Sequence, residues 1–262
     1  MVARHSFDQG LEDLHMDLIK MGSLVEESID NAIVALKKQD VELARQIFQN
    51  DDIIDDYEKK IEKKCMNLIA RQQPLAKDLR TISTALKIIT DMERIADASS
   101  DIAEIILRMS GKKYIKPLID LPKMAELARI MVNKSIDAYV RQDVELAEKV
   151  CASDDDVDAL FNKVILELIN LMRNDPNTIE QGVDLMFIAK YIERMGDHAT
   201  NIGEWVVFNV TGEHDRLARL YHKESAHVPP YADFELDGGK DQKDGEKGKD
   251  DMGSNYGKGG IE

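Results

Sequence analysis

Apolar residues recur along most of this chain with the spacing of amphipathic helices. Leu, Ile, Val, Ala and Met return every three or four positions, and only six prolines interrupt the pattern. It predicts six long helices, at residues 7–37, 41–72, 75–109, 119–140, 144–173 and 177–211. Long helices joined by short turns pack antiparallel. The sequence therefore predicts an all-α fold of two tandem three-helix bundles.

The two predicted bundles share an internal repeat. The six residues Gln39–Ala44 recur without change as Gln142–Ala147, and further along Glu93–Asp97 recurs as Glu193–Asp197 with two changes. The first pair of segments is offset by 103 residues and the second pair by 100 residues. A tandem duplication is the simplest explanation, so we expect one fold used twice.

The end of the chain has a different composition. Eight of the 15 glycines fall in the last 28 residues, among Asp, Lys and Glu. This composition is typical of segments that bury too little apolar surface to fold. We therefore predict a first bundle at residues 1–112, a second at 113–216 and a disordered tail at 217–262.

Charge and composition argue against several classes of protein. The chain has 50 Asp and Glu against 35 Lys and Arg, a formal charge of -15, whereas binding to nucleic acid requires clustered cations. Two cysteines are too few for a disulfide framework or a thiolate zinc site. No apolar run reaches the roughly 18 residues that a membrane span requires. Because no basic and then apolar leader precedes His5, we expect a cytoplasmic location.

Carboxylates gather on one face of the third predicted helix. An apolar stripe on this helix continues as Glu93, Asp97 and Asp101. At about 100° per residue these acids share one face. Folding the preceding helix back at the intervening turn sets Asp51 and Asp55 level with Asp97 and Glu93. The sequence therefore predicts facing carboxylates between two helices.

The second repeat predicts the same arrangement, with Asp154 and Asp158 level with Asp197 and Glu193. Facing carboxylates without a basic partner repel one another and raise one another's pKa values, and a multivalent cation removes the conflict. Oxygen ligands suit Mg, Mn or Ca, and also iron where carboxylates bridge several ions. We therefore predict a divalent or trivalent metal at each site, with zinc kept as a candidate. The alternative is a solvated acidic face paired with nearby arginines and lysines.

Candidates for catalysis are weaker. His198 follows Asp197 and points about 100° away from the acidic face, so packing is expected rather than metal ligation. The sequence has no Gly-rich phosphate loop, nucleophile elbow or paired-Cys zinc spacing. We expect no catalytic residues. Two alternatives stay open: a carboxylate-bridged metal hydrolase or oxidase in which Glu93 or Glu193 activates a metal-bound water, and a metal-free helical scaffold.

Several motifs occur together and in order along the two repeats. They are Arg71–Pro74, Asp78–Arg80, Glu93–Asp97, Glu193–Ile202 and Val210–His214. With this set the chain resembles the PhoU family over roughly residues 4–215. The resemblance implies a tandem three-helix-bundle fold, in agreement with the apolar pattern.

The resemblance also implies a function. It implies a cytoplasmic, usually dimeric, non-enzymatic regulator that damps the high-affinity phosphate ABC transporter and the phosphate-starvation two-component system. The implied partners are the ATPase subunit of the transporter and a phosphate-sensing membrane histidine kinase. Acidic motifs that hold multinuclear metal clusters in some members map onto Asp51, Asp55, Glu93, Asp97, Asp154, Asp158, Glu193 and Asp197. Asp101 stands where the family more often has Asn, so we expect a more anionic first site.

Overall fold

The computed structural model describes residues 2–72 and 74–213. The predicted disordered tail at 217–262 lies outside the described residues. Within these residues the elements are α1 (Val2–Lys38), α2 (Val41–Gln72), α3 (Ala76–Arg108), α4 (Asp120–Arg141), α5 (Val144–Ala152), α6 (Asp154–Asn174), the 3-10 turn η1 (Pro176–Thr178) and α7 (Ile179–Thr211). No strand occurs in this part of the chain, and none of its helices is both long and apolar enough to span a membrane.

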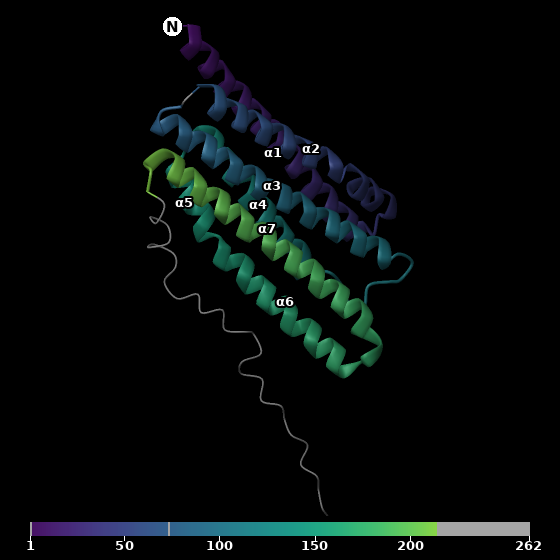
Figure 1. Ribbon diagram of the computed structural model, residues 1–262. Coiled ribbons are helices and arrows are strands. Elements are labelled where there is room, and N and C mark those ends of the chain that lie inside the picture. Colours follow the sequence, from purple (N-terminus) through teal and green to yellow (C-terminus); the bar gives the residue numbers. More distant parts are fainter. Residues whose placement is uncertain (1, 73, 214–262) are drawn as a thin grey trace, which may run out of the picture.

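The helices form two bundles that meet along a central pair of helices, one from each bundle. Helices α1, α2 and α3 pack on one another, and α4 packs on α5, α6 and α7. Helices α3 and α7 lie side by side at the centre, with α2 outside α3 and α6 outside α7 (Figure 1). Helices α1 and α4 also touch each other. The predicted all-α fold of two tandem three-helix bundles is confirmed.

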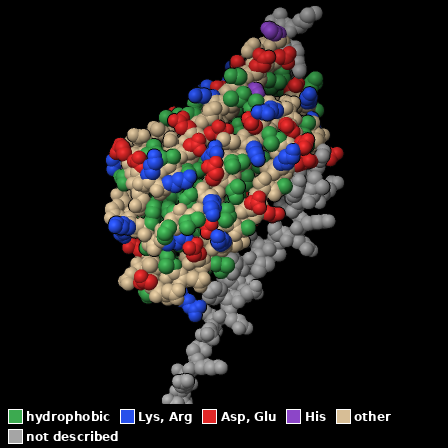
Figure 2. Space-filling model, turned by 180° about the vertical axis from the view of Figure 1, so that it is seen from behind, with side chains coloured by type: hydrophobic (Ala, Val, Ile, Leu, Met, Phe, Trp, Pro, Cys, Tyr) green, Lys and Arg blue, Asp and Glu red, His purple; other side chains and the backbone are tan. Residues whose placement is uncertain are grey.

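One continuous aliphatic core joins the two bundles. Every α-helix contributes buried apolar residues to it. The predicted seams are buried, namely Ile88, Met92, Ile95, Ile102 and Ile106 on α3 and Ile188, Ile192, Met195, Ala199, Ile202 and Val206 on α7. On the rear surface, acidic and basic side chains are interspersed with apolar ones (Figure 2). The core thereby fixes which faces of α3 and α7 turn towards α2 and α6.

The six-residue repeat encodes the end of one helix and the start of the next. Gln39 and Gln142 both have φ of 52°, a left-handed conformation that ends a helix. Asp40 follows and its carboxylate accepts a hydrogen bond from the backbone N–H of Leu43 at 3.0 Å. Asp143 caps α5 in the same way, through the N–H of Leu146, also at 3.0 Å. The repeat therefore fixes equivalent helix starts in the two bundles.

The prediction of one unbroken helix at 144–173 is wrong, because the chain breaks at Ser153. Its hydroxyl donates to the Lys149 carbonyl at 2.8 Å and its N–H donates to the Val150 carbonyl at 3.0 Å, a tighter turn than that of an α-helix. The acids Asp154–Asp156 then occupy the first turn of α6, where free N–H groups favour negative charge. In the first repeat the equivalent Asn50 lies inside the unbroken α2.

Replacing Asp143 with Ala should lower the free energy of unfolding by about 1 kcal/mol, because the Leu146 N–H loses its acceptor. Urea denaturation followed by circular dichroism measures the change. Asp143→Asn keeps an acceptor oxygen and should unfold close to wild type. An equal loss in both variants would show that the hydrogen bond to the Leu146 N–H is not what stabilises the start of α5.

Candidate metal centre

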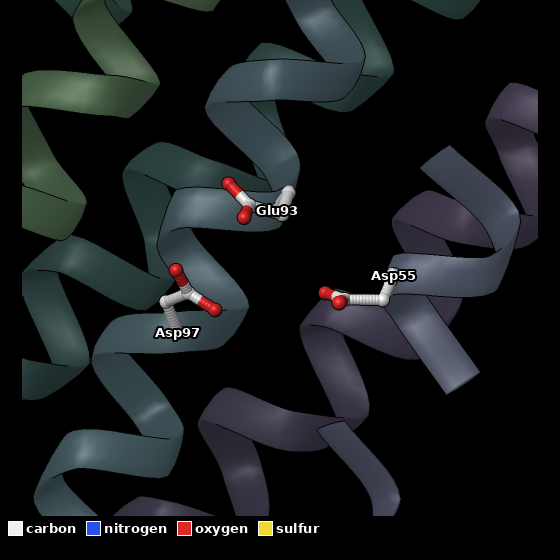
Figure 3. A group of neighbouring side chains, drawn as sticks. All are labelled: Asp55, Glu93 and Asp97. Atoms are coloured by element: carbon white, nitrogen blue, oxygen red, sulfur yellow. The ribbon is translucent and has the colours of Figure 1, made fainter. Parts of the chain in front are cut away.

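Three predicted ligands meet in the groove between α2 and α3. Asp55 comes from α2, and Glu93 and Asp97 lie one turn apart on α3. One carboxylate oxygen from each lies within 4.8 Å of the other two. The Asp55 carboxylate points across the groove towards α3 (Figure 3). All three side chains retain some exposure, so the cluster is open to solvent ions.

Burial and mutual repulsion raise the pKa values of this first groove. Burial, followed by the neighbouring charges of Asp97, Glu58 and Asp55, raises the pKa of Glu93 to about 7. Burial is also the largest cause of the raised pKa of Asp97, followed by Asp55. Without a cation, the groove therefore keeps protons close to neutral pH.

Two other predicted ligands lie at the ends of the first groove. Burial, then Asp97 and Asp55, raise the pKa of Asp51 to about 6. Asp101 lies one turn beyond Asp97 and is hydrogen-bonded to Tyr191 of α7, which opposes the rise in pKa that burial causes. Asp51 thus extends the groove, whereas Asp101 also takes part in the contact between α3 and α7.

The second groove, between α6 and α7, contains the four carboxylates that the repeat predicts. Burial, then Asp197, Asp158 and Glu193, raise the pKa of Asp154 to about 7. Burial and Glu193 raise the pKa of Asp197 to about 6. In this groove, however, Glu193 is bound by Lys190, whose Nζ lies 2.5 Å from Glu193 Oε2. The second groove therefore repeats the four acids with a basic partner beside them, and among the described residues only the first groove brings three carboxylates within 4.8 Å of one another.

Sequence reasoning did not find Glu58. This residue lies one turn after Asp55 on α2, and its Oε1 is 3.4 Å from the Thr90 hydroxyl of α3. Its charge contributes to the raised pKa of Glu93. Residues 58 and 90 lie equally far from Pro74, so the same hairpin register that paired the other acids would have identified it.

His198 is buried in the interface between α3 and α7. Its Nδ1 lies 2.9 Å from Asp91 Oδ1, and the Asn201 amide donates to the same oxygen at 3.2 Å. This placement agrees with the packing role expected for His198. The histidine therefore connects the two repeats.

The donor set of the first groove fits a hard cation. Among the described residues, the group whose ligand atoms lie within 4.8 Å of one another consists of carboxylates alone. Carboxylate oxygens favour Mg, Mn, Ca or iron. Both cysteines are buried and unpaired. Asp55, Glu93 and Asp97 can thus supply oxygen ligands to a divalent or trivalent ion.

Fold and grooves together define a class, the tandem three-helix-bundle proteins with carboxylate-lined grooves. A family profile described as the PhoU domain matches residues 18–106 and 121–206, one match in each repeat. The chain belongs to the PhoU family.

Individual relatives and solved structures agree with this assignment. A Clostridium acetobutylicum protein named phosphate-specific transport system accessory protein PhoU homolog is 42% identical over 213 residues, covering 81% of this chain and 97% of that protein. A homolog of the same name from Aquifex aeolicus is 40% identical over 184 residues, covering 70% and 83%. The crystal structure of PhoU from Pseudomonas aeruginosa superposes with a TM-score of 0.77 at 34% identity, covering 79% of this chain and 100% of that one.

In metal-free protein, Asp154→Asn should stabilise the fold more at pH 8 than at pH 5, with a difference of about 1 kcal/mol or more. The folded state keeps the Asp154 proton up to a pKa of about 7, whereas the unfolded state loses it near 3.8. The contribution of this carboxyl group to the free energy of unfolding is therefore most favourable below pH 3.8, and it is lost as the pH rises to about 7. Asn removes that loss because it does not ionise.

Thermal denaturation in a chelator at both pH values measures this effect. Asp156→Asn, which changes an exposed acid in the same helical turn, provides the control, and the pH-dependent difference in stability should be larger for Asp154→Asn. If Asp154→Asn changed the stability equally at both pH values, the pKa of Asp154 would not be raised in the folded protein.

Proposed function

We propose that this protein is an accessory regulator of a phosphate transport system that restrains phosphate uptake and the phosphate-starvation response when phosphate is plentiful. The observation that carries the proposal is the 42% identity to a phosphate-specific transport accessory protein over 97% of its length. The family match in both repeats supports it. The proposed partners are the ATPase subunit of the phosphate ABC transporter and a membrane histidine kinase, and the proposed state is a homodimer in the cytoplasm.

The proposed role of the acidic grooves is to bind metal cations that set the shape of the bundle surface. In the first groove, Asp55 on α2 and Glu93 and Asp97 on α3 would hold the ion. Burial, followed by the facing charges, raises the pKa of Glu93 to about 7, and these facing charges oppose close packing of the two helices. An ion bound by residues of both helices would offset that repulsion and fix their spacing, and so the surface that the hairpin offers to a partner.

The proposal is one of binding rather than catalysis. Enzymes that use carboxylate-bridged metals usually combine carboxylates with histidine. Within the described residues the clustered ligands are carboxylates, and the nearby His198 is buried against Asp91. The groove is therefore proposed as a structural cation site.

Adding Mn²⁺ to metal-free protein at pH 7 should raise the melting temperature. A stabilisation of about 3 kcal/mol is expected once free Mn²⁺ exceeds its Kd by about a hundredfold. Asp97→Asn should reduce this shift, because it removes one of the three clustered carboxylates. Asp56→Asn changes an exposed acid beside Asp55 and should keep the full shift. No Mn²⁺-dependent shift in the wild type would refute cation binding.

Deleting the gene should raise phosphate uptake and starvation-induced phosphatase expression in phosphate-rich medium. Plasmid-borne wild type and Asp56→Asn should restore repression, whereas the double variant Asp55→Asn/Asp97→Asn should restore it only in part. Labelled phosphate uptake and phosphatase activity measure the outcome, with immunoblots to match protein levels. Unchanged uptake and phosphatase after deletion would contradict the regulatory role, and full repression by the double variant would separate regulation from the first groove.

A further inference from the structure

One pair of facing positions gives the two grooves different charges. In the first groove, Glu58 on α2 faces Thr90 on α3, with the Thr90 hydroxyl 3.4 Å from Glu58 Oε1. The repeat offsets place Phe161 of α6 at the position of Glu58 and Lys190 of α7 at that of Thr90. These two also meet, because Lys190 Nζ lies 5.6 Å from the Phe161 ring centroid. The facing pair therefore carries a carboxylate in the first groove, from Glu58, and an ammonium group in the second, from Lys190.

The Lys190 side chain is 46% exposed, but its ammonium group makes two contacts at the second groove. Its Nζ lies 2.5 Å from Glu193 Oε2, and the Glu193 side chain is only 4% exposed. The face of the Phe161 ring provides a second attraction for the same cation. The charge of Lys190 also opposes the rise in pKa at Asp197. The ammonium group therefore supplies positive charge to two of the four predicted ligands.

The first groove has no equivalent of Lys190. Its direct basic contact among the described residues is Lys59, which lies 3.4 Å from Asp55 and is 66% exposed. An exposed pair on one helix contributes little because water screens it. The charges of Arg194 and Arg94 also oppose the rise in the pKa of Asp97, but in the part of the chain that the structure describes neither arginine forms an ion pair with the three clustered carboxylates. Glu58 instead adds a further negative charge beside Glu93 and Asp55.

We propose that Lys190 is the internal counter-ion of the second groove, so that the chain binds multivalent cations preferentially in the first groove, where Glu58 strengthens binding. This inference rests on the cation binding proposed above. A cation entering the second groove must compete with an ammonium group already bound to Glu193, whereas one entering the first groove meets an additional carboxylate. The near-identical acidic motifs would then act differently. The first groove would bind a metal ion, and Lys190 would neutralise the carboxylates of the second.

Mn²⁺ binding to the full chain at pH 7, followed by electron paramagnetic resonance of free Mn²⁺, tests the inference. Disabling the first groove with Asp55→Asn/Asp97→Asn should remove the tight binding. Disabling the second with Asp158→Asn/Asp197→Asn should leave it. Glu58→Gln should weaken tight binding several-fold, and circular dichroism confirms that each variant folds.

The decisive variant is Lys190→Thr, which gives the second groove the residue of the first. Combined with Asp55→Asn/Asp97→Asn, it should restore Mn²⁺ binding, with an affinity at least about ten-fold above that of the double variant. Lys190→Arg in the same background keeps the charge and should restore none. Equal Mn²⁺ affinity in the two wild-type grooves, or no gain from Lys190→Thr, would overturn the inference while leaving cation binding intact. Absence of any Mn²⁺ binding to the wild type would overturn both.

Discussion

Repulsion between the facing carboxylates is the physical constraint on which the arrangement of the helices depends. Aliphatic residues such as Ile88 and Ile95 hold α3 in one orientation, and that orientation turns Glu93 and Asp97 towards Asp55 on α2. Burial, followed by the neighbouring charges of Asp97, Glu58 and Asp55, raises the pKa of Glu93 to about 7 in this arrangement. Because apolar burial maintains the groove and charge opposes it, a cation can change the balance between them.

The central pair α3 and α7 relates the two grooves. Across it, Asp91 binds His198 at 2.9 Å and Arg108 binds Asp184 at 2.6 Å, while Asp101 bonds to Tyr191. These polar contacts join two repeats that share one aliphatic core. The helix that lines one groove is therefore bonded to the helix that lines the other.

Periodicity predicted most of the fold, because the apolar seams are long and the repeat doubles the signal. It also predicted the facing of Asp55 with Glu93, since a helical hairpin fixes the register of its two arms. The break at Ser153 was not predicted, because the apolar pattern continues through a local tighter turn in which the Ser153 N–H bonds to the Val150 carbonyl. Glu58 and Lys190 were not predicted. The site residues were chosen because the same acids occur in both repeats, and these two positions differ between the repeats.

The most direct measurement is anomalous diffraction from crystals grown with Mn²⁺ at neutral pH. The account predicts a strong anomalous peak between α2 and α3, bound by oxygens of Asp55, Glu93 and Asp97. Crystals that contain Mn²⁺ but show those carboxylates bound to lysine, arginine or water alone, with no anomalous peak in the groove, would contradict it.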